Sequence, residues 1–161
     1  MTIVDHPARQ TAELNNRIKE QFGDSACWRA SVDMGMIVFL DFGERRKLIG
    51  KRGPVTIGWI RVLIHGDPWV AEIDDKVVLA SEDVLDGGDE SLVDPIFVGR
   101  RLLRVDWGVE CLLTFSDGLV LRISRESERP EHDNIVELRF ANGDCVDCFA
   151  SGSIETEAED Q

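Results

Sequence analysis

Two turn-forming dipeptides in the second half of the chain constrain its fold more than any other feature. Asp117-Gly118 and Asn142-Gly143 each separate two short runs that mix apolar and polar residues. Asp-Gly and Asn-Gly pairs favour the positive φ angles of tight turns, so each pair predicts an antiparallel β-hairpin. The strands predicted in this half are 102–105, 111–115 with 119–123, and 135–140 with 145–150.

The first half adds one helix and further strands. Leu14, Ile18 and Phe22 recur every four residues before Gly23, which predicts an amphipathic helix over 8–22. Beyond this helix the apolar period changes to two, which predicts strands. These are 32–42, 57–64, 69–73 and 76–80. The run 32–42 is apolar on both faces in its middle, so it is interpreted as one central buried strand.

The two halves also share a pattern. Val32-Asp33-Met34-Gly35 is similar to Val105-Asp106-Trp107-Gly108, and residues 71–73 are similar to 136–138. Two such β units facing each other predict a mostly β fold, an antiparallel β-sandwich or a partly open barrel, with one N-terminal helix. Chance similarity between short strand patterns is the alternative explanation. The all-β prediction does not depend on the duplication.

The chain is predicted to form a single domain. Its 161 residues match a common domain size, and the predicted domain covers 8–151. A flexible N-terminus, 1–7, is expected before it, and a disordered acidic tail, 152–161, after it. The first ten residues lack the basic region and apolar stretch of a signal peptide, so a cytoplasmic location is expected. No run approaches the ~18 apolar residues of a membrane span.

Charge favours a protein partner over nucleic acid. The formal net charge is −13 at pH 7. Binding to nucleic-acid phosphates needs clustered Lys and Arg, so no nucleic-acid partner is expected. An acidic protein instead meets a basic protein partner faster through long-range attraction.

The acidic loop over 81–95 is the predicted contact surface. The residues nominated for binding a basic partner are Glu82, Asp83, Asp86, Asp89 and Glu90. The loop lacks the Asp-x-Asp-x-Asp-Gly order of a calcium site, so neither a metal nor another cofactor is predicted. A plain solvated loop is the alternative interpretation.

A basic segment interrupts this acidic chain. Residues 44–53 hold five Lys and Arg residues, and Arg100, Arg101 and Arg104 form a second basic group. Gly50-Lys51-Arg52-Gly53 lacks the earlier glycine and the Ser or Thr of a phosphate-binding P-loop, so nucleotide binding is not supported. The favoured interpretation is a basic loop that balances the acidic loops within the protein. Contact with a phosphate or an RNA backbone is the alternative.

The cysteines and histidines do not form a catalytic motif. Cys145 and Cys148 have CxxC spacing, but no second Cys or His pair accompanies them as a zinc site would require. They fall in a predicted strand, where residues three apart point to opposite faces, so a structural role is favoured. His65 and His132 adjoin turn or loop signals. The sequence therefore predicts no catalytic residue and a protein that is not an enzyme.

The second half also carries a resemblance. The stretches 99–108 and 113–123, with the closing hairpin and residues 69–83, resemble small uncharacterised bacterial β domains. Such domains are similar to immunity-type proteins that accompany secreted toxins. The resemblance implies a binding role and names no target.

These observations predict a non-enzymatic protein-binding module. It would be an immunity or inhibitor protein that captures a basic partner through its acidic loops. One alternative is a small-molecule or nucleotide-sensing β-barrel that uses a cavity between the two units. Another is a small metal-dependent enzyme built on His65, His132, Cys145 and Cys148. Four tryptophans lie in or near strand patterns, and any exposed one is a hot-spot candidate.

Overall fold

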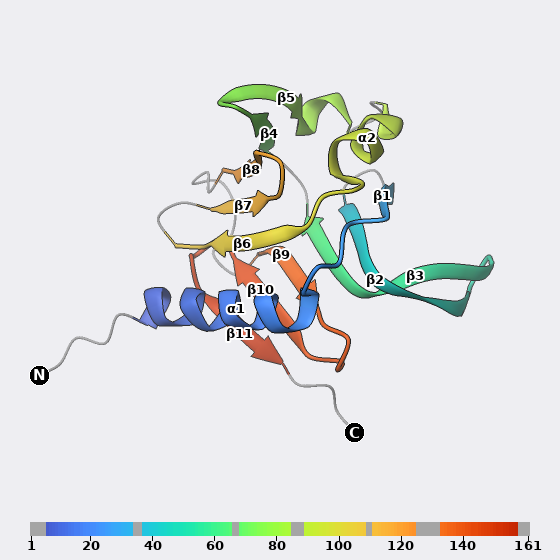
Figure 1. Ribbon diagram of the computed structural model, residues 1–161, viewed down its shortest axis with the longest axis horizontal. Helices are drawn as coiled ribbons and strands as arrows, with labels where there is room; N and C mark the ends of the chain where they lie inside the picture. The colour runs from blue at the N-terminus through green and yellow to red at the C-terminus, as the bar shows by residue number, and fades with distance from the viewer. Residues whose placement is uncertain are drawn as a thin grey trace, which may run out of the picture.

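The computed structural model describes residues 6–33, 37–65, 68–84, 89–108, 111–124 and 133–157 (Figure 1). In the first half the elements are α1 (His6–Phe22), β1 (Arg29–Asp33), β2 (Ile37–Gly50), β3 (Gly53–His65), β4 (Trp69–Ile73) and β5 (Lys76–Ala80). Three short helices follow: η1 (Ser81–Asp83), η2 (Glu90–Leu92) and α2 (Val93–Phe97). The second half holds β6 (Leu102–Asp106), β7 (Leu112–Phe115), β8 (Leu119–Ile123), β9 (Asn134–Arg139), β10 (Cys145–Phe149) and β11 (Ile154–Glu157).

The strands form two antiparallel sheets that pack as a β-sandwich. One sheet has the order β1-β2-β3-β9-β10-β11, and the other has the order β5-β4-β8-β7-β6. The predicted mostly β fold with one N-terminal helix is therefore confirmed. Among the described strands the two sheets do not join into a closed barrel.

The strand order repeats between the two sheets. The strands β1-β2-β3 lie beside the hairpin β9-β10, and the strands β6-β7-β8 lie beside the hairpin β4-β5. Each half of the chain thus places three strands in one sheet and its following hairpin in the other. Two repeated units would give this strand order if they exchanged hairpins, whereas units that face each other as separate sheets would not. Val32-Asp33 and Val105-Asp106 fall at the same place, the ends of β1 and β6.

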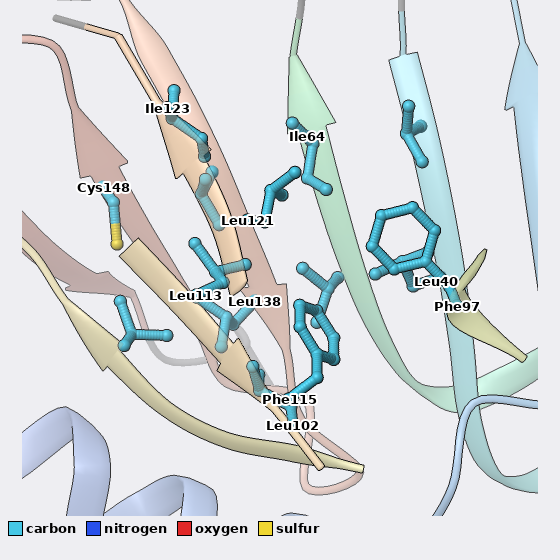
Figure 2. Close-up of a cluster of buried hydrophobic side chains, with 14 of the residues drawn as sticks. Leu40, Ile64, Phe97, Leu102, Leu113, Phe115, Leu121, Ile123, Leu138 and Cys148 are labelled. Carbon is cyan, nitrogen blue, oxygen red and sulfur yellow. The ribbon is translucent and has the colours of Figure 1, made fainter. Parts of the chain in front are cut away.

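The apolar core lies between the sheets (Figure 2). Leu40 and Ile64 from one sheet belong to the same buried cluster as Leu113 and Leu121 from the other, and all four are fully buried. Each buried side chain of this size stabilises the fold by about 1.5–3 kcal/mol. The Cys148 side chain also points into this core.

Helix α1 covers the outer edge of β6. The side-chain amide of Asn15 donates to the Val105 carbonyl at 2.8 Å, and its Oδ1 accepts from the Val105 amide at 2.7 Å. Thr11 Oγ1 donates to the Trp107 carbonyl at 3.1 Å. The helix thus satisfies backbone groups that an uncovered edge strand would leave available for aggregation. Its apolar face, Leu14, Ile18 and Phe22, is buried as the four-residue spacing predicts.

Asn15→Ala is expected to lower the free energy of unfolding by about 1–3 kcal/mol, because both backbone groups of Val105 lose their bonds. Urea unfolding followed by tryptophan fluorescence measures this loss. Asn16→Ala is the matched control, since the neighbouring asparagine is exposed. Equal losses in the two variants would show that the amide does not hold the β6 edge.

Three sequence expectations differ from the structure. The single strand predicted over 32–42 is wrong, because β1 and β2 are antiparallel and Asp33 pairs with Ile37. The disordered tail predicted from 152 is wrong over Ile154–Glu157, which pairs with β10 as β11 and buries Ile154. The acidic composition of this segment does not indicate a strand, because backbone pairing with β10 does not require apolar side chains. The helix begins at His6, and residues 1–5 and 158–161 lie outside the described part of the chain. No helix within the described residues is long and apolar enough to cross a membrane.

Candidate functional site

A β-bulge redirects the β2–β3 hairpin where it leaves the sandwich. Phe42 pairs with Ile60, but the next pair is Arg45 with Gly58, so two residues of β2 oppose one residue of β3. Gly43 in this bulge has a φ of +70°, which favours glycine. At Gly58 a Cβ atom would lie 2.5 Å from the Phe42 carbonyl oxygen. Both glycines are therefore needed for the bend.

Beyond the bulge, residues 44–58 form a two-stranded extension that we call the arm. Figure 1 shows the β2–β3 hairpin extending away from both sheets. The corresponding hairpin of the second half, β7–β8, closes within residues 116–118. The repeated fold therefore does not require the arm.

The arm combines positive charge with exposed apolar side chains. It carries five basic residues and one acidic residue, a formal charge of +4 in a chain of net charge −13. Ile49 near its tip is 92% exposed, and Leu48 and Val55 are 42% and 43% exposed. Val55 and Trp59 share one face of β3 by strand alternation, and Leu48 pairs with Val55. Leu48, Val55 and Trp59 therefore form an apolar strip along one side of the arm, and Ile49 lies near the tip.

A buried carboxylate anchors the base of the arm. Asp41 is fully buried, and its Oδ1 accepts from the Gly58 amide at 3.0 Å and from Arg61 Nε at 2.7 Å. Arg29 Nε lies 3.7 Å from Asp41 Oδ2. Burial lowers the pKa of Arg61, and the Asp41 charge opposes that shift. Asp41 thus satisfies the Gly58 amide next to the bulge and fixes the mostly buried guanidinium of Arg61, whose side chain is 12% exposed.

Next to the arm's base lies a hollow of about 280 Å³ that we call the arginine hollow. Arg46, Arg61 and Arg139 line it together with Trp59 and the turn 141–143. The Arg46 guanidinium stacks 4.5 Å from the Trp59 ring centre. Arg61 and Arg139 meet because they are paired residues of β3 and β9. Trp59 is 41% exposed, so it meets the condition that the sequence analysis sets for a hot-spot candidate.

A second hollow, of about 410 Å³, adjoins the first. The two share Trp59 and Ala141, and Gly43, Glu44 and Ile60 line the second. Its lining is mainly apolar, so we call it the apolar hollow. Together the two hollows form the arginine–tryptophan groove.

A polar cluster lies on β9 and β10 beside the groove. Glu137, Cys145 and Asp147 each place a donor atom within 4.8 Å of the other two, which is close enough for a metal ion. Glu137 is already paired with Arg139 at 2.8 Å. Burial raises the pKa of Cys145 to about 12, so a metal would have to displace its proton. The donors are suitable, but the existing contacts oppose a cation here.

Asp147→Asn tests the electrostatics of this cluster. Burial raises the pKa of Asp147, so the folded chain holds its proton more tightly than the unfolded chain does. The contribution of this group to stability therefore falls as pH rises through its folded pKa. The free energy of unfolding of the variant, relative to wild type, should rise between about pH 4 and about pH 7. A difference that falls with pH in urea titrations would contradict the shift.

The CxxC pair does not act as a unit. Cys145 pairs with Arg139 on the outer face, whereas Cys148 pairs with Val136 and enters the core. Burial raises the pKa of both thiols, which keeps them protonated near neutral pH. His65 is half-buried on β3, and burial lowers its pKa. His132 lies outside the described residues.

Four of the five nominated acidic residues lie in or next to the short helices η1 and η2, and all four are exposed. Glu82, Asp83, Asp89 and Glu90 are exposed, and Asp86 lies outside the described residues. Asp83 accepts from the Ala80 amide at 3.1 Å. Asp89 accepts from the Ser91 amide and hydroxyl at 3.0 and 2.6 Å, and these bonds lower the pKa of Asp89. Asp83 and Asp89 therefore form local hydrogen bonds that stabilise turns, and these bonds explain two of the four described carboxylates without a partner protein.

The basic segment, residues 44–53, is not the loop that the sequence analysis predicts. It lies mostly in β2, and within the described residues none of its five basic side chains forms an ion pair with an acidic residue. The second basic group does have local partners: Arg101 pairs with Asp24, and Arg104 pairs with Asp106. Arg61, Arg139 and Trp59 were not nominated from the sequence as parts of one site. The run of basic residues was the available signal for this region.

Comparisons with protein-family models, with curated proteins and with solved structures found no match for this chain. No relative therefore supplies a ligand or a residue role. The geometry of the arm and the groove is the basis for a functional assignment.

Proposed function

We propose that this protein is a non-enzymatic protein-binding module that acts in the cytoplasm, and that the arm is its contact element. The observation that carries this proposal is the arm itself. It extends the β2–β3 hairpin beyond the sandwich, it has a formal charge of +4, and it exposes Ile49.

The exposed apolar strip supports a protein as the partner. A two-stranded ribbon is only marginally stable in water, and among the described strands none pairs with the tip of this one apart from β2 and β3 themselves. A partner that covers Leu48, Ile49 and Val55 would remove apolar surface from water, which favours association. Nucleic acid would meet the negative charge of the rest of the chain.

The charge of the arm changes the expected partner. An acidic surface with an apolar depression complements a basic arm that carries Ile49 at its tip. An immunity or inhibitor role remains part of this proposal. Capture of a basic partner by Glu82, Asp83, Asp86, Asp89 and Glu90 is the second candidate, and the same experiment separates the two.

The test is affinity capture from the native host with three tagged proteins. One is wild type, one combines Ile49→Ser, Lys51→Glu and Arg52→Glu, and one combines Glu82→Gln with Glu90→Gln. Wild type and the loop variant should retain one stoichiometric acidic protein, and the arm variant should lose it. High salt should weaken the complex, because screening reduces its electrostatic attraction. A basic protein lost only from the loop variant would favour the second candidate, and no specific protein at low salt would contradict both.

A further inference from the structure

We propose that the arginine–tryptophan groove binds a phosphate monoester whose organic part includes a flat ring system. The phosphate would occupy the arginine hollow and the ring would occupy the apolar hollow. This inference goes beyond protein binding by the arm, and it rests on the groove alone.

The arginine hollow has spare donors for a phosphate. Among the described residues Arg46 forms no ion pair, and its buried Nε has no hydrogen-bond partner. Arg61 donates Nε to Asp41, and its two terminal nitrogens have no partner within the described part of the chain. Arg139 uses Nε and Nη2 for Glu137, and its Nη1 likewise has no partner among the described residues. Guanidinium groups bind phosphate oxygens in a bidentate geometry, and three of them here match a doubly charged group.

The apolar hollow has the shape and lining for a ring. Trp59 borders both hollows, so a ligand whose phosphate lies beside Arg46 can place its body against the indole or across Ala141. Gly43 carries no side chain, which leaves this space open, and Ile60 supplies an apolar wall. Small-molecule sites commonly combine a mainly apolar wall with a few polar groups that fix orientation.

The charge of the surrounding protein and the adjoining apolar hollow limit which other anions the groove can bind. The chain as a whole is strongly acidic, so a polyanion that extends beyond the groove would meet repulsion. A single phosphate fits within the local field of the three guanidiniums. A purely inorganic anion would leave the adjoining apolar hollow unused.

The test uses the purified full-length chain and phenyl phosphate, with inorganic phosphate and phenol as the two halves of the ligand. Calorimetry should give saturable one-to-one binding of phenyl phosphate that is at least about tenfold tighter than binding of either half. Arg46→Gln and Trp59→Leu should each weaken binding about tenfold or more, while Arg104→Gln, an exposed arginine paired with Asp106, should not. Thermal melts confirm that each variant is folded. Absence of saturable binding by the wild-type protein, or binding by the Arg46 and Trp59 variants as tight as that of wild type, would overturn the proposal.

Two sources of this chemistry can be separated with the same assay. Adenosine monophosphate represents a free nucleotide, and phosphotyrosine amide represents a modified side chain of a partner protein. The compound that binds more tightly identifies the source of the ligand. If neither compound binds, the inference is contradicted. The calorimetry uses no cellular partner, so a negative result there does not contradict the proposal that the arm binds a protein. A negative result in the affinity capture likewise does not contradict ligand binding in the groove.

Discussion

Asp41→Ala should lower the free energy of unfolding by about 3–5 kcal/mol, which is among the largest effects expected of any single substitution in this chain. The carboxylate is fully buried and serves the Gly58 amide and Arg61 together. Its removal leaves a mostly buried guanidinium without its counter-charge and an amide without its acceptor. The cost of an unpaired buried charge exceeds the net value of the pair, so the loss is large.

Two companion variants identify the cause of that loss. Glu155→Ala removes an exposed carboxylate from the edge of the same sheet and should change stability by no more than about 0.5 kcal/mol. Adding Arg61→Leu to Asp41→Ala should recover part of the stability, because the unpaired charge is then gone. Urea unfolding of the four proteins measures these differences. A loss below about 1 kcal/mol for Asp41→Ala would contradict a buried ion pair at the arm's base.

Phe22→Ala should destabilise the fold by about 3–5 kcal/mol. Phe22 is 2% exposed, and its ring centre lies 5.1 Å from that of Phe42 and 5.8 Å from that of Phe140. These contacts join the C-terminal end of α1 to β2 and to the β9–β10 turn. The substitution leaves a cavity at this junction and weakens the docking of α1 as a whole.

Phe22→Leu is the matched variant, since it keeps most of the volume and should cost clearly less than the alanine substitution. Hydrogen exchange gives the second measurement. Release of α1 should speed exchange at the Val105 amide, which Asn15 covers, more than at amides in the middle of β8. Uniform protection in the alanine variant would mean that Phe22 does not control the docking of the helix.

Local signals explain which parts of the fold the sequence predicts. The β7–β8 turn forms as predicted, with φ angles of 60° at Asp117 and 79° at Gly118. The helix follows from the spacing of its apolar residues, and it ends beside Gly23, whose φ is +53°. Each of these features depends on residues close in sequence. That is why short motifs are sufficient to predict them.

Features that depend on pairing between distant residues escape sequence reasoning. The reversal between β1 and β2 is hidden because an apolar run looks the same in one strand or in two. The bulge that turns the arm depends on Gly58 meeting the Phe42 carbonyl across the hairpin. The groove depends on the β3–β9 register that sets Arg61 against Arg139. Basic residues in the sequence thus indicate charge, but only the register shows where that charge gathers.

Site-specific photocrosslinking in the native host tests the central claim that the arm contacts a partner. The reactive residue p-benzoylphenylalanine would replace Ile49 at the arm, Val77 on β5 as an exposed apolar control, or Glu82 in the acidic loop. We expect one discrete cross-linked protein at position 49 and none at position 77 or 82. A cross-link formed at position 82 and absent at position 49 would contradict the assignment of the arm as the contact element.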